Sequence, residues 1–216
     1  MEEPEPERCC FDDWVDSWSD KATRRPTAAK VSASLLDAIT ETGVADRTIL
    51  DVGCGIGDLA IEVVARGAAS GTGFDLSAKA IDEARKLAQR RGVGDRLRFE
   101  VGDGAKLDLP AADIVVINRV VCCYPDTGNL LERTLGAARS VYAITAPIST
   151  GSIGAYNRIR NRCWNVWYRL RRTKFAGFRT FVHDLNGIDE RIRAAGFHRV
   201  HHEHRRVVWD LAVYAR

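Results

Sequence analysis

The sequence predicts an α/β fold built on a doubly wound, mostly parallel, seven-stranded sheet, with helices on both faces and an antiparallel hairpin at one edge. Three observations support this fold class. Short apolar runs alternate with amphipathic helical stretches along the chain. The run 114–117 is apolar throughout, as expected of a parallel strand buried on both faces. A glycine-rich loop between Gly53 and Gly57 joins the first strand to its helix.

The predicted elements follow one another regularly. A helical face between Ala28 and Ile39 precedes a glycine stop at Gly43, and Ser77 is the expected N-cap of a later helix. The other elements are strands at 48–52, 70–74, 96–101, 114–117 and 141–145, the last ended by Pro147, helices at 59–66, 130–138, 154–171 and 185–195, and hairpin strands at 197–204 and 207–214.

Length and composition indicate one domain. The 216 residues are enough for a single core, and an apolar content of 45% with a charged content of 28% is typical of globular proteins. The acidic N-terminus does not resemble a signal peptide, and no apolar run is long enough to span a membrane. We therefore expect a cytoplasmic protein, a monomer or homodimer, whose six cysteines are reduced thiols.

Two acidic residues end neighbouring predicted strands around the glycine loop. Asp51 precedes the loop and Asp75 ends the next strand, an arrangement suited to a nucleoside with free ribose hydroxyls. The loop has the spacing G-x-G-x-G, whereas dinucleotide-binding folds use G-x-G-x-x-G. Asp51 would repel a pyrophosphate at this place, but it suits a ligand that carries an ammonium and a sulfonium group.

The segment from Asp51 to Gly57 resembles the first motif of class I S-adenosylmethionine-dependent methyltransferases. Three later stretches, at 74–77, 102–105 and 112–118, resemble their ribose-binding, adenine-contacting and fourth-strand segments in the right order. The resemblance implies a Rossmann-like fold with S-adenosyl-L-methionine as cofactor. It divides the chain into N-terminal helices at 1–45 that could form a lid, a cofactor-binding core at 48–146, and substrate-side helices and strands at 147–216.

The crevice at the carboxyl ends of the strands is the expected cofactor site. Asp75 can accept from both ribose hydroxyls, Asp103 from the adenine amine, and Asp51 with the Gly53 carbonyl can face the methionine ammonium. The other predicted cofactor contacts come from the loops and strand ends around them: Cys54, Gly55, Ile56, Gly57, Leu76, Gly104, Ala105 and Asn118. A turn cap is the alternative role for each aspartate, above all for Asp103.

Methyl transfer is an in-line displacement, so catalysis depends mainly on positioning, and a base is needed only for a protonated nucleophile. Tyr124 follows the fourth strand, where it could line the pocket or pack beneath the next helix. The run 118–125 resembles that of magnesium-protoporphyrin O-methyltransferases, with Cys123 where they have histidine. The catalytic candidates thus fall into two clusters, at 119–124 with Tyr124 and at 179–184 with His183, which could act as base or be a surface histidine.

The sequence thus predicts a methyltransferase for a small-molecule acceptor, at oxygen, with no nucleic-acid partner. One alternative is a thiol or arsenical acceptor, with Cys122, Cys123 and Cys163 as soft ligands. Another is a non-catalytic cofactor-binding or RNA-binding protein of the same fold. The latter would use the stretch 158–179, which has seven arginines, one lysine and no acid.

Two further patterns bear on ligands. The apolar residues Ile159, Cys163, Val166, Trp167 and Leu170 recur at helical spacing among the arginines, which predicts an amphipathic helix with a solvated basic side. Four histidines lie on a predicted edge strand, where alternation puts His198, His202 and His204 on one face. We expect no metal site there.

Overall fold

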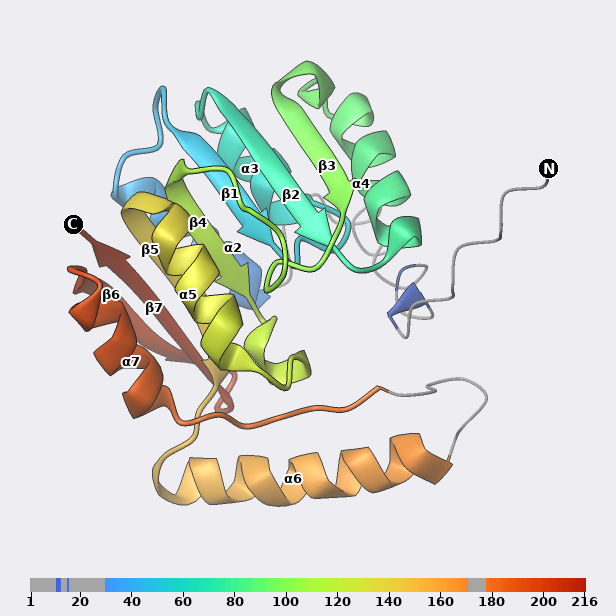
Figure 1. The fold of residues 1–216 in the computed structure, drawn as a ribbon, viewed down its shortest axis with the longest axis vertical. Coiled ribbons are helices and arrows are strands. Elements are labelled where there is room, and N and C mark those ends of the chain that lie inside the picture. Colours follow the sequence, from blue (N-terminus) through green and yellow to red (C-terminus); the bar gives the residue numbers. More distant parts are fainter. Residues whose placement is uncertain (1–10, 13–14, 16–29, 171–177) are drawn as a thin grey trace.

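One sheet of seven strands forms the centre of the protein (Figure 1). The computed structural model describes residues 11–12, 15, 30–170 and 178–216. The strand order is β3-β2-β1-β4-β5-β7-β6. Strand β7 is antiparallel to both of its neighbours, and the pairs among β1 to β5 are parallel. The predicted doubly wound sheet with an antiparallel edge hairpin is confirmed.

The observed elements agree closely with those predicted. The strands are β1 (Thr48–Val52), β2 (Ser70–Asp75), β3 (Leu97–Val101), β4 (Ala112–Asn118), β5 (Ala138–Pro147), β6 (His198–Arg205) and β7 (Trp209–Ala215). The helices are α2 (Lys30–Glu41), α3 (Asp58–Ala65), α4 (Ala78–Arg90), α5 (Thr127–Ala137), α6 (Gly151–Leu170) and α7 (Leu185–Ala194), with short 3-10 turns η1 (Gly94–Arg96) and η2 (Val121–Cys123).

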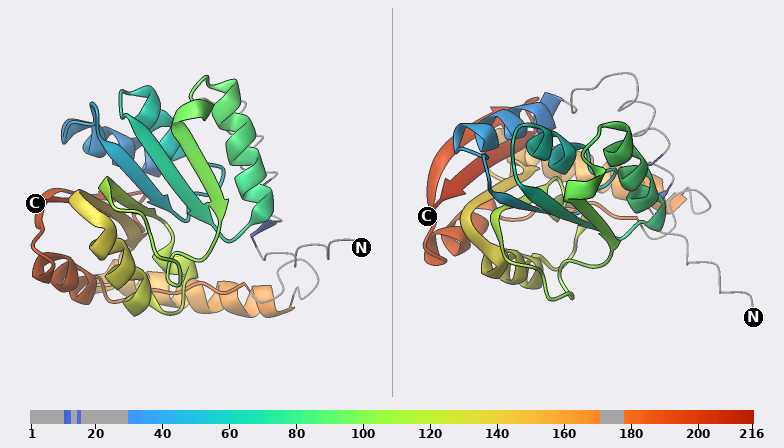
Figure 2. Two further views of the ribbon diagram at one scale, coloured as in Figure 1. Left: turned by 45° about the horizontal axis from the view of Figure 1, so that its top comes forward. Right: turned by 90° about the horizontal axis from the view of Figure 1, so that it is seen from above.

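Helices cover both faces of the sheet and form two separate cores (Figure 2). Helices α2, α3 and α4 pack on one face around Leu35, Ile61 and Ile81. Helices α5 and α7 pack on the other around Leu131 and Ile192. Helix α6 lies apart from both layers, along the edge toward which β1 and β2 point (Figure 1). That edge holds the loops of the predicted site.

The predicted cap at Ser77 is confirmed, because its hydroxyl accepts a hydrogen bond from the Ala80 backbone N–H. The predicted strand end before Pro147 is wrong: β5 continues through Pro147, which pairs with Trp209 of β7. On the other side, pairing with β4 has already ended at Thr145. The proline can join the strand because its missing N–H then costs no bond to β4.

The predicted histidine face is wrong for His198. The register of β6 against β7 shifts between Arg199 and His201, so one extra residue is inserted there. Such a bulge reverses the alternation of side chains. His198 therefore points to the face of His201, whereas His202 and His204 share the opposite one.

Some predictions fall on residues that the structure does not describe. Most of residues 1–29, which belong to the possible lid at 1–45, are among them, as is the part of the basic stretch at 171–177. Of the aromatic residues near the N-terminus, Phe11 is described, and its ring meets that of Phe178 at a centroid distance of 5.4 Å. Among the helices that the structure describes, none combines the length and apolar character needed to cross a membrane.

Candidate functional site

The site lies where the strand order reverses. Strand β1 has β2 on one side and β4 on the other, so the loops that follow β1 and β4 diverge. In doubly wound sheets this divergence opens the ligand crevice. Asp51 lies in β1 opposite Val116 of β4, and Asn118 follows two residues later. Both side chains therefore point to the same face of the sheet.

The glycine loop adopts the backbone that its sequence predicts. Gly53, Gly55 and Gly57 have φ values of +74°, +55° and +72°, a region that other residues avoid. A Cβ on Gly53 would come within 2.3 Å of the Val120 side chain, after β4. The loop is tied to β2 because the Gly53 backbone N–H donates to the Phe74 carbonyl oxygen at 2.7 Å.

Asp51 is a buried carboxylate with an unsatisfied oxygen. Asp51 is 2% exposed, and its Oδ1 atom has no hydrogen-bond partner. Burial, reinforced by repulsion from Asp58 and Asp75, raises the Asp51 pKa from its ordinary 3.8 to about 8. A buried acceptor without a partner is costly, so this position favours a ligand that brings positive charge or a donor.

Two more unsatisfied oxygens lie on the same face, in β4 and β5, the next two strands of the sheet. Asn118 Oδ1 and Thr145 Oγ1 are buried without partners, and these two residues face each other in the β4–β5 register. The Asn118 amide is oriented by Ser32 of α2, whose hydroxyl accepts from Nδ2 at 2.9 Å. Sequence reasoning missed Thr145 and Ser32. The available signal was that the strand predicted at 141–145 ends at Thr145, as the preceding strand ends near Asn118.

Asp75 occupies the end of β2, as predicted, and braces the glycine loop. Its Oδ2 accepts from the Gly55 N–H at 2.8 Å, and its Oδ1 accepts from the Ser77 N–H at 2.9 Å. Burial raises the Asp75 pKa. Each carboxylate oxygen has a second lone pair, so both remain able to accept a ribose hydroxyl.

Asp103 is more fully used within the protein. The Tyr124 hydroxyl donates to the Asp103 carboxylate, with distances of 2.9 and 3.0 Å to its two oxygens. Asp103 also accepts from the Ala105 N–H and pairs with Lys106. The turn-cap role is thus present, and the predicted adenine contact would use what lone-pair capacity is left.

The predicted apolar contacts differ in their exposure. Leu76, which directly follows β2, is 42% exposed and is available to a flat ring. Ile56, Ala105 and Cys54 are buried, and burial raises the pKa of the Cys54 thiol. Gly104 leaves room for Val52, since a Cβ there would come within 2.3 Å of it.

The two separate clusters of catalytic candidates come together in the structure. In the tautomer with its proton on Nε2, His183 donates to the Tyr124 carbonyl oxygen at 3.0 Å. The Phe181 N–H donates to the Cys122 carbonyl oxygen at 2.7 Å, and its ring stacks on His183. Burial and the Asp103 carboxylate raise the Tyr124 pKa to about 12, so its phenol stays protonated at neutral pH.

The cysteine pair after β4 is close but only partly accessible. The Sγ atoms of Cys122 and Cys123 are 3.5 Å apart, and Cys122 is buried. The hydrogen bond from Cys123 lowers the Cys122 pKa, and Arg119 lowers it further. Cys163 lies exposed on α6, so it does not share the buried surroundings of Cys122. Of the three thiols, the structure therefore shows direct contact between Cys122 and Cys123.

Possible metal ligands in the described residues gather on the edge hairpin. The ligand atoms of His202, His204 and Asp210 lie within 4.8 Å of one another. Asp210 Oδ1 is 2.7 Å from His202 Nε2 and 3.1 Å from His204 Nε2. These exposed histidines form hydrogen bonds or ion pairs with the carboxylate, which accounts for the arrangement without an ion.

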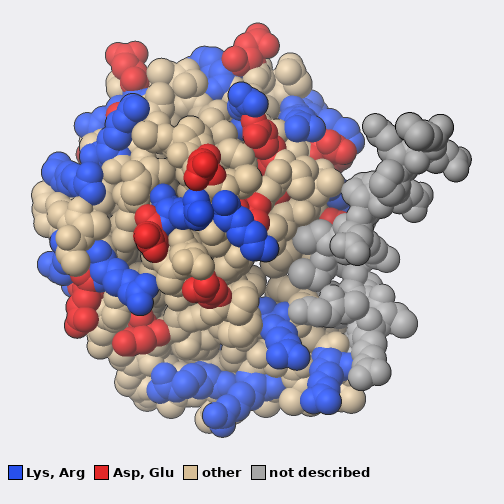
Figure 3. Space-filling view, viewed as in Figure 1, with Lys and Arg blue, Asp and Glu red and all other residues tan. Residues whose placement is uncertain are grey.

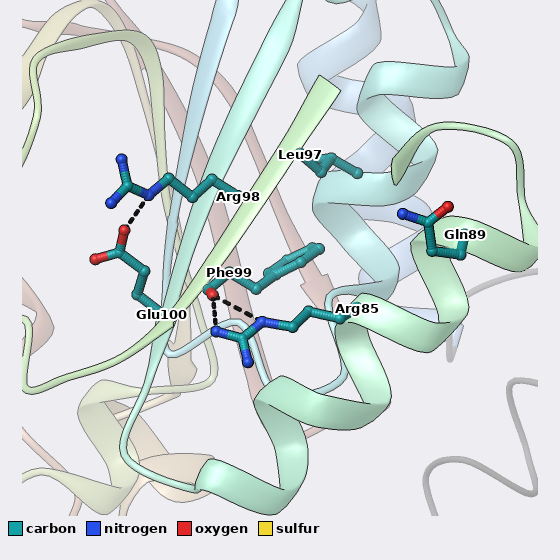
Figure 4. Close-up of a pocket in the computed structure, with 6 residues that line it drawn as sticks. All are labelled: Arg85, Gln89, Leu97, Arg98, Phe99 and Glu100. Carbon is teal, nitrogen blue, oxygen red and sulfur yellow. Dashed lines mark hydrogen bonds and ion pairs between the residues drawn. The ribbon is translucent and has the colours of Figure 1, made fainter. Parts of the chain in front are cut away.

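A shallow depression of about 500 Å³ lies away from this crevice, at the outer strand β3 (Figure 4). Its lining is largely self-satisfied: Arg85 donates to the Phe99 carbonyl oxygen, and Arg98 pairs with Glu100. None of the predicted site residues lines it. The candidate site therefore remains the crevice at the carboxyl ends of β1, β2 and β4.

Comparison with known proteins agrees with this geometry. Residues 49–141 match a family model described as a methyltransferase domain. The fold, the motif order and this match together identify the chain as carrying a class I S-adenosylmethionine-dependent methyltransferase domain.

Similar proteins share either the core or the whole fold. The ribosomal protein L11 methyltransferase of Serratia proteamaculans is 44% identical over 98 residues, 41% of this chain and 33% of that protein. The chain thus spans about a third of the length of this curated relative. One similar solved structure is the magnesium protoporphyrin IX methyltransferase ChlM of Synechocystis PCC 6803 with bound SAH. It has a TM-score of 0.70 at 19% identity, and the alignment covers 95% of this chain and 97% of ChlM. The [4+2]-cyclase SpnF has a TM-score of 0.71 at 17% identity, covering 95% and 93%. These structures share the fold and differ in their named reactions.

Proposed function

We propose that the chain transfers a methyl group from S-adenosylmethionine to a small-molecule acceptor, at oxygen. The observation that carries the proposal is the buried, unsatisfied Asp51 carboxylate beside the glycine loop. A cationic cofactor would supply the positively charged partner that this buried carboxylate lacks. Asp75 would hold the ribose hydroxyls, and Leu76 would contact the adenine.

The cofactor supplies an electrophilic methyl carbon whose leaving group is a neutral thioether. If the acceptor is a hydroxyl, its oxygen would take the methyl group as the thioether leaves, so the hydroxyl proton would have to pass to a base of the chain. His183 is the proposed base. With Nε2 donating to the Tyr124 carbonyl, its Nδ1 lone pair remains to accept that proton. The raised pKa of Tyr124 makes it a poor base, so its hydroxyl serves to position Asp103.

The choice of a small acceptor rests on where each resemblance lies. The match to the ribosomal protein methyltransferase extends over two-fifths of the chain, a length close to that of the cofactor core. The likeness to the porphyrin methyltransferase extends over nearly the whole chain, including the part after residue 146. A protein acceptor, as the name of the first relative suggests, is the second candidate.

Calorimetry in buffers of different ionisation enthalpy tests the cofactor step. Asp51 is mostly protonated at pH 7 if its pKa is about 8. Binding a cation beside it should therefore release about one proton per cofactor. The release should disappear in Asp51→Asn and persist in Asp82→Asn, an exposed carboxylate on α4. No binding by the wild type, or preference for a nicotinamide dinucleotide, contradicts the proposal.

The acceptor is tested with methyl-labelled cofactor. One set of reactions contains phenols and carboxylic acids, and the other contains ribosomal proteins. We expect label in the small molecules and a strong loss of rate in His183→Ala below pH 8, where a phenol keeps its proton. Label in protein alone would favour the second candidate. An unchanged pH–rate profile in His183→Ala would exclude this histidine as base.

A further inference from the structure

Helix α6 turns its polar side toward the protein body and its apolar side toward solvent, the opposite of the usual arrangement for a surface helix. The side that faces the body is polar: Asn157 donates to the Ile148 and Val208 carbonyl oxygens at 2.9 and 3.1 Å. Asn161 and Asn165 both donate to the Thr180 carbonyl oxygen. Asn157, Asn161 and Asn165 are spaced four apart, so they form one stripe along the helix.

The opposite side is apolar and open to solvent. Ile159, Val166 and Leu170 are 63%, 59% and 78% exposed, and Tyr156 is 55% exposed. Ile159 lies two positions after Asn157, which turns its side chain about 200° away from the body at 3.6 residues per turn. We call Tyr156, Ile159, Val166 and Leu170 the outer face of α6. Ile159, Val166 and Leu170 belong to the apolar stripe that the sequence predicts, and the described residues leave all three exposed.

Arginines border the outer face. Arg158, Arg160, Arg162 and Arg169 all belong to α6, and the helix contains no acidic residue. Figure 3 shows Lys and Arg side chains gathered over the region of α6. The Arg160 guanidinium lies 5.7 Å from the centre of the Tyr156 ring, which keeps this charge beside the apolar stripe. A surface that binds here must offer both apolar contact and negative charge.

We propose that the outer face of α6 docks on the surface of an anionic lipid bilayer. An interfacial helix combines an apolar face with flanking basic residues and lies in the membrane plane without spanning it. At 20 residues, α6 is about 30 Å long, enough to present the whole stripe to the boundary between headgroups and acyl chains. The arginines would then meet the phosphate layer.

The other partners fit less well. Two copies docked through this face would bring eight arginines together without an acid from either α6. RNA would need aromatic platforms for its bases. However, Trp164 stacks on Tyr168 at 5.7 Å, Tyr168 meets Phe178 edge-on at 4.8 Å, and the outer face is largely aliphatic.

Vesicle flotation with the full chain tests the proposal. We expect binding to phosphatidylcholine–phosphatidylglycerol vesicles and much weaker binding to pure phosphatidylcholine, with the difference shrinking as salt rises. The triple variant Ile159→Ser, Val166→Ser, Leu170→Ser should lose at least tenfold in affinity. These side chains are exposed, so the variant should keep the thermal midpoint of the wild type.

A charge variant and a matched control complete the test. Arg162→Gln with Arg169→Gln should weaken binding to anionic vesicles by about 5-fold per arginine. Val200→Ser with Val207→Ser removes two exposed valines from the edge hairpin and should bind as the wild type does. Undiminished binding by the triple variant overturns the proposal. The proposal is also overturned if the wild type binds no vesicles and forms a dimer that the triple substitution makes monomeric. Tight RNA binding that resists salt would overturn it as well.

Discussion

Replacement of Asp51 by asparagine should stabilise the cofactor-free protein while weakening cofactor binding. The wild-type carboxylate is buried beside Asp58 and Asp75, and one of its oxygens has no partner. Its pKa is raised to about 8 in the folded chain and returns to about 3.8 on unfolding. Between pH 3.8 and about 8, the folded state therefore keeps a proton on Asp51 that the unfolded state has lost.

The sign and size of the effect follow from proton linkage. A raised carboxyl pKa contributes stability below pH 3.8, and this contribution is lost as the pH rises toward 8. At about 1.4 kcal/mol per pKa unit, the loss is about 4 kcal/mol at pH 7. Asparagine avoids this loss, but its amide N–H groups cost about 1–3 kcal/mol if they are unpaired. We expect a net gain of about 1–3 kcal/mol at pH 7.

Urea unfolding at pH 5, 6, 7 and 8 provides the assay. The difference in free energy of unfolding between Asp51→Asn and the wild type should grow by about 1 kcal/mol for each pH unit, because other titrating groups cancel between the two proteins. Asp82→Asn, on the exposed side of α4, should show a constant difference. A difference that stays flat from pH 5 to 8 for Asp51→Asn, or a variant less stable than the wild type at pH 8, would refute the reasoning.

Four further substitutions test the remaining contacts. Asp75→Ala should weaken S-adenosylmethionine binding by about 1.5–3 kcal/mol, the range for hydrogen bonds to a charged group, and calorimetry giving wild-type affinity would remove Asp75 from the site. Tyr124→Phe leaves the Asp103 carboxylate without its phenol donor and should lower the free energy of unfolding in urea by about 1–2 kcal/mol; an unchanged value would mean that solvent replaces the bond. Cys122→Ser and Cys123→Ala should change the thermal midpoint but not cofactor affinity, and arsenite methylation lost in both variants would instead support the thiol-based alternative.

Local chain chemistry explains why much of the cofactor loop was predictable. The positive φ values of Gly53, Gly55 and Gly57 depend on residues that lack a Cβ, and the loop lies between a strand and a helix that their own periodicities indicate. Asp51 and Asp75 could be placed near one another because parallel strands that follow a doubly wound order end at one edge. Their contacts to cofactor remain predictions, since the residues alone do not show what each oxygen accepts.

The sequence by itself determined the α/β fold, the order of its elements and the methyltransferase motifs, because periodicity and glycine placement act within a few residues. Only the tertiary structure decided which oxygens stay unsatisfied, as with Thr145 opposite Asn118. It also decided that the bulge in β6 separates His198 from His202. The same holds for α6: periodicity reveals an apolar stripe with Ile159 in it, but its direction is set by hydrogen bonds to distant carbonyl groups, and no local pattern encodes those partners.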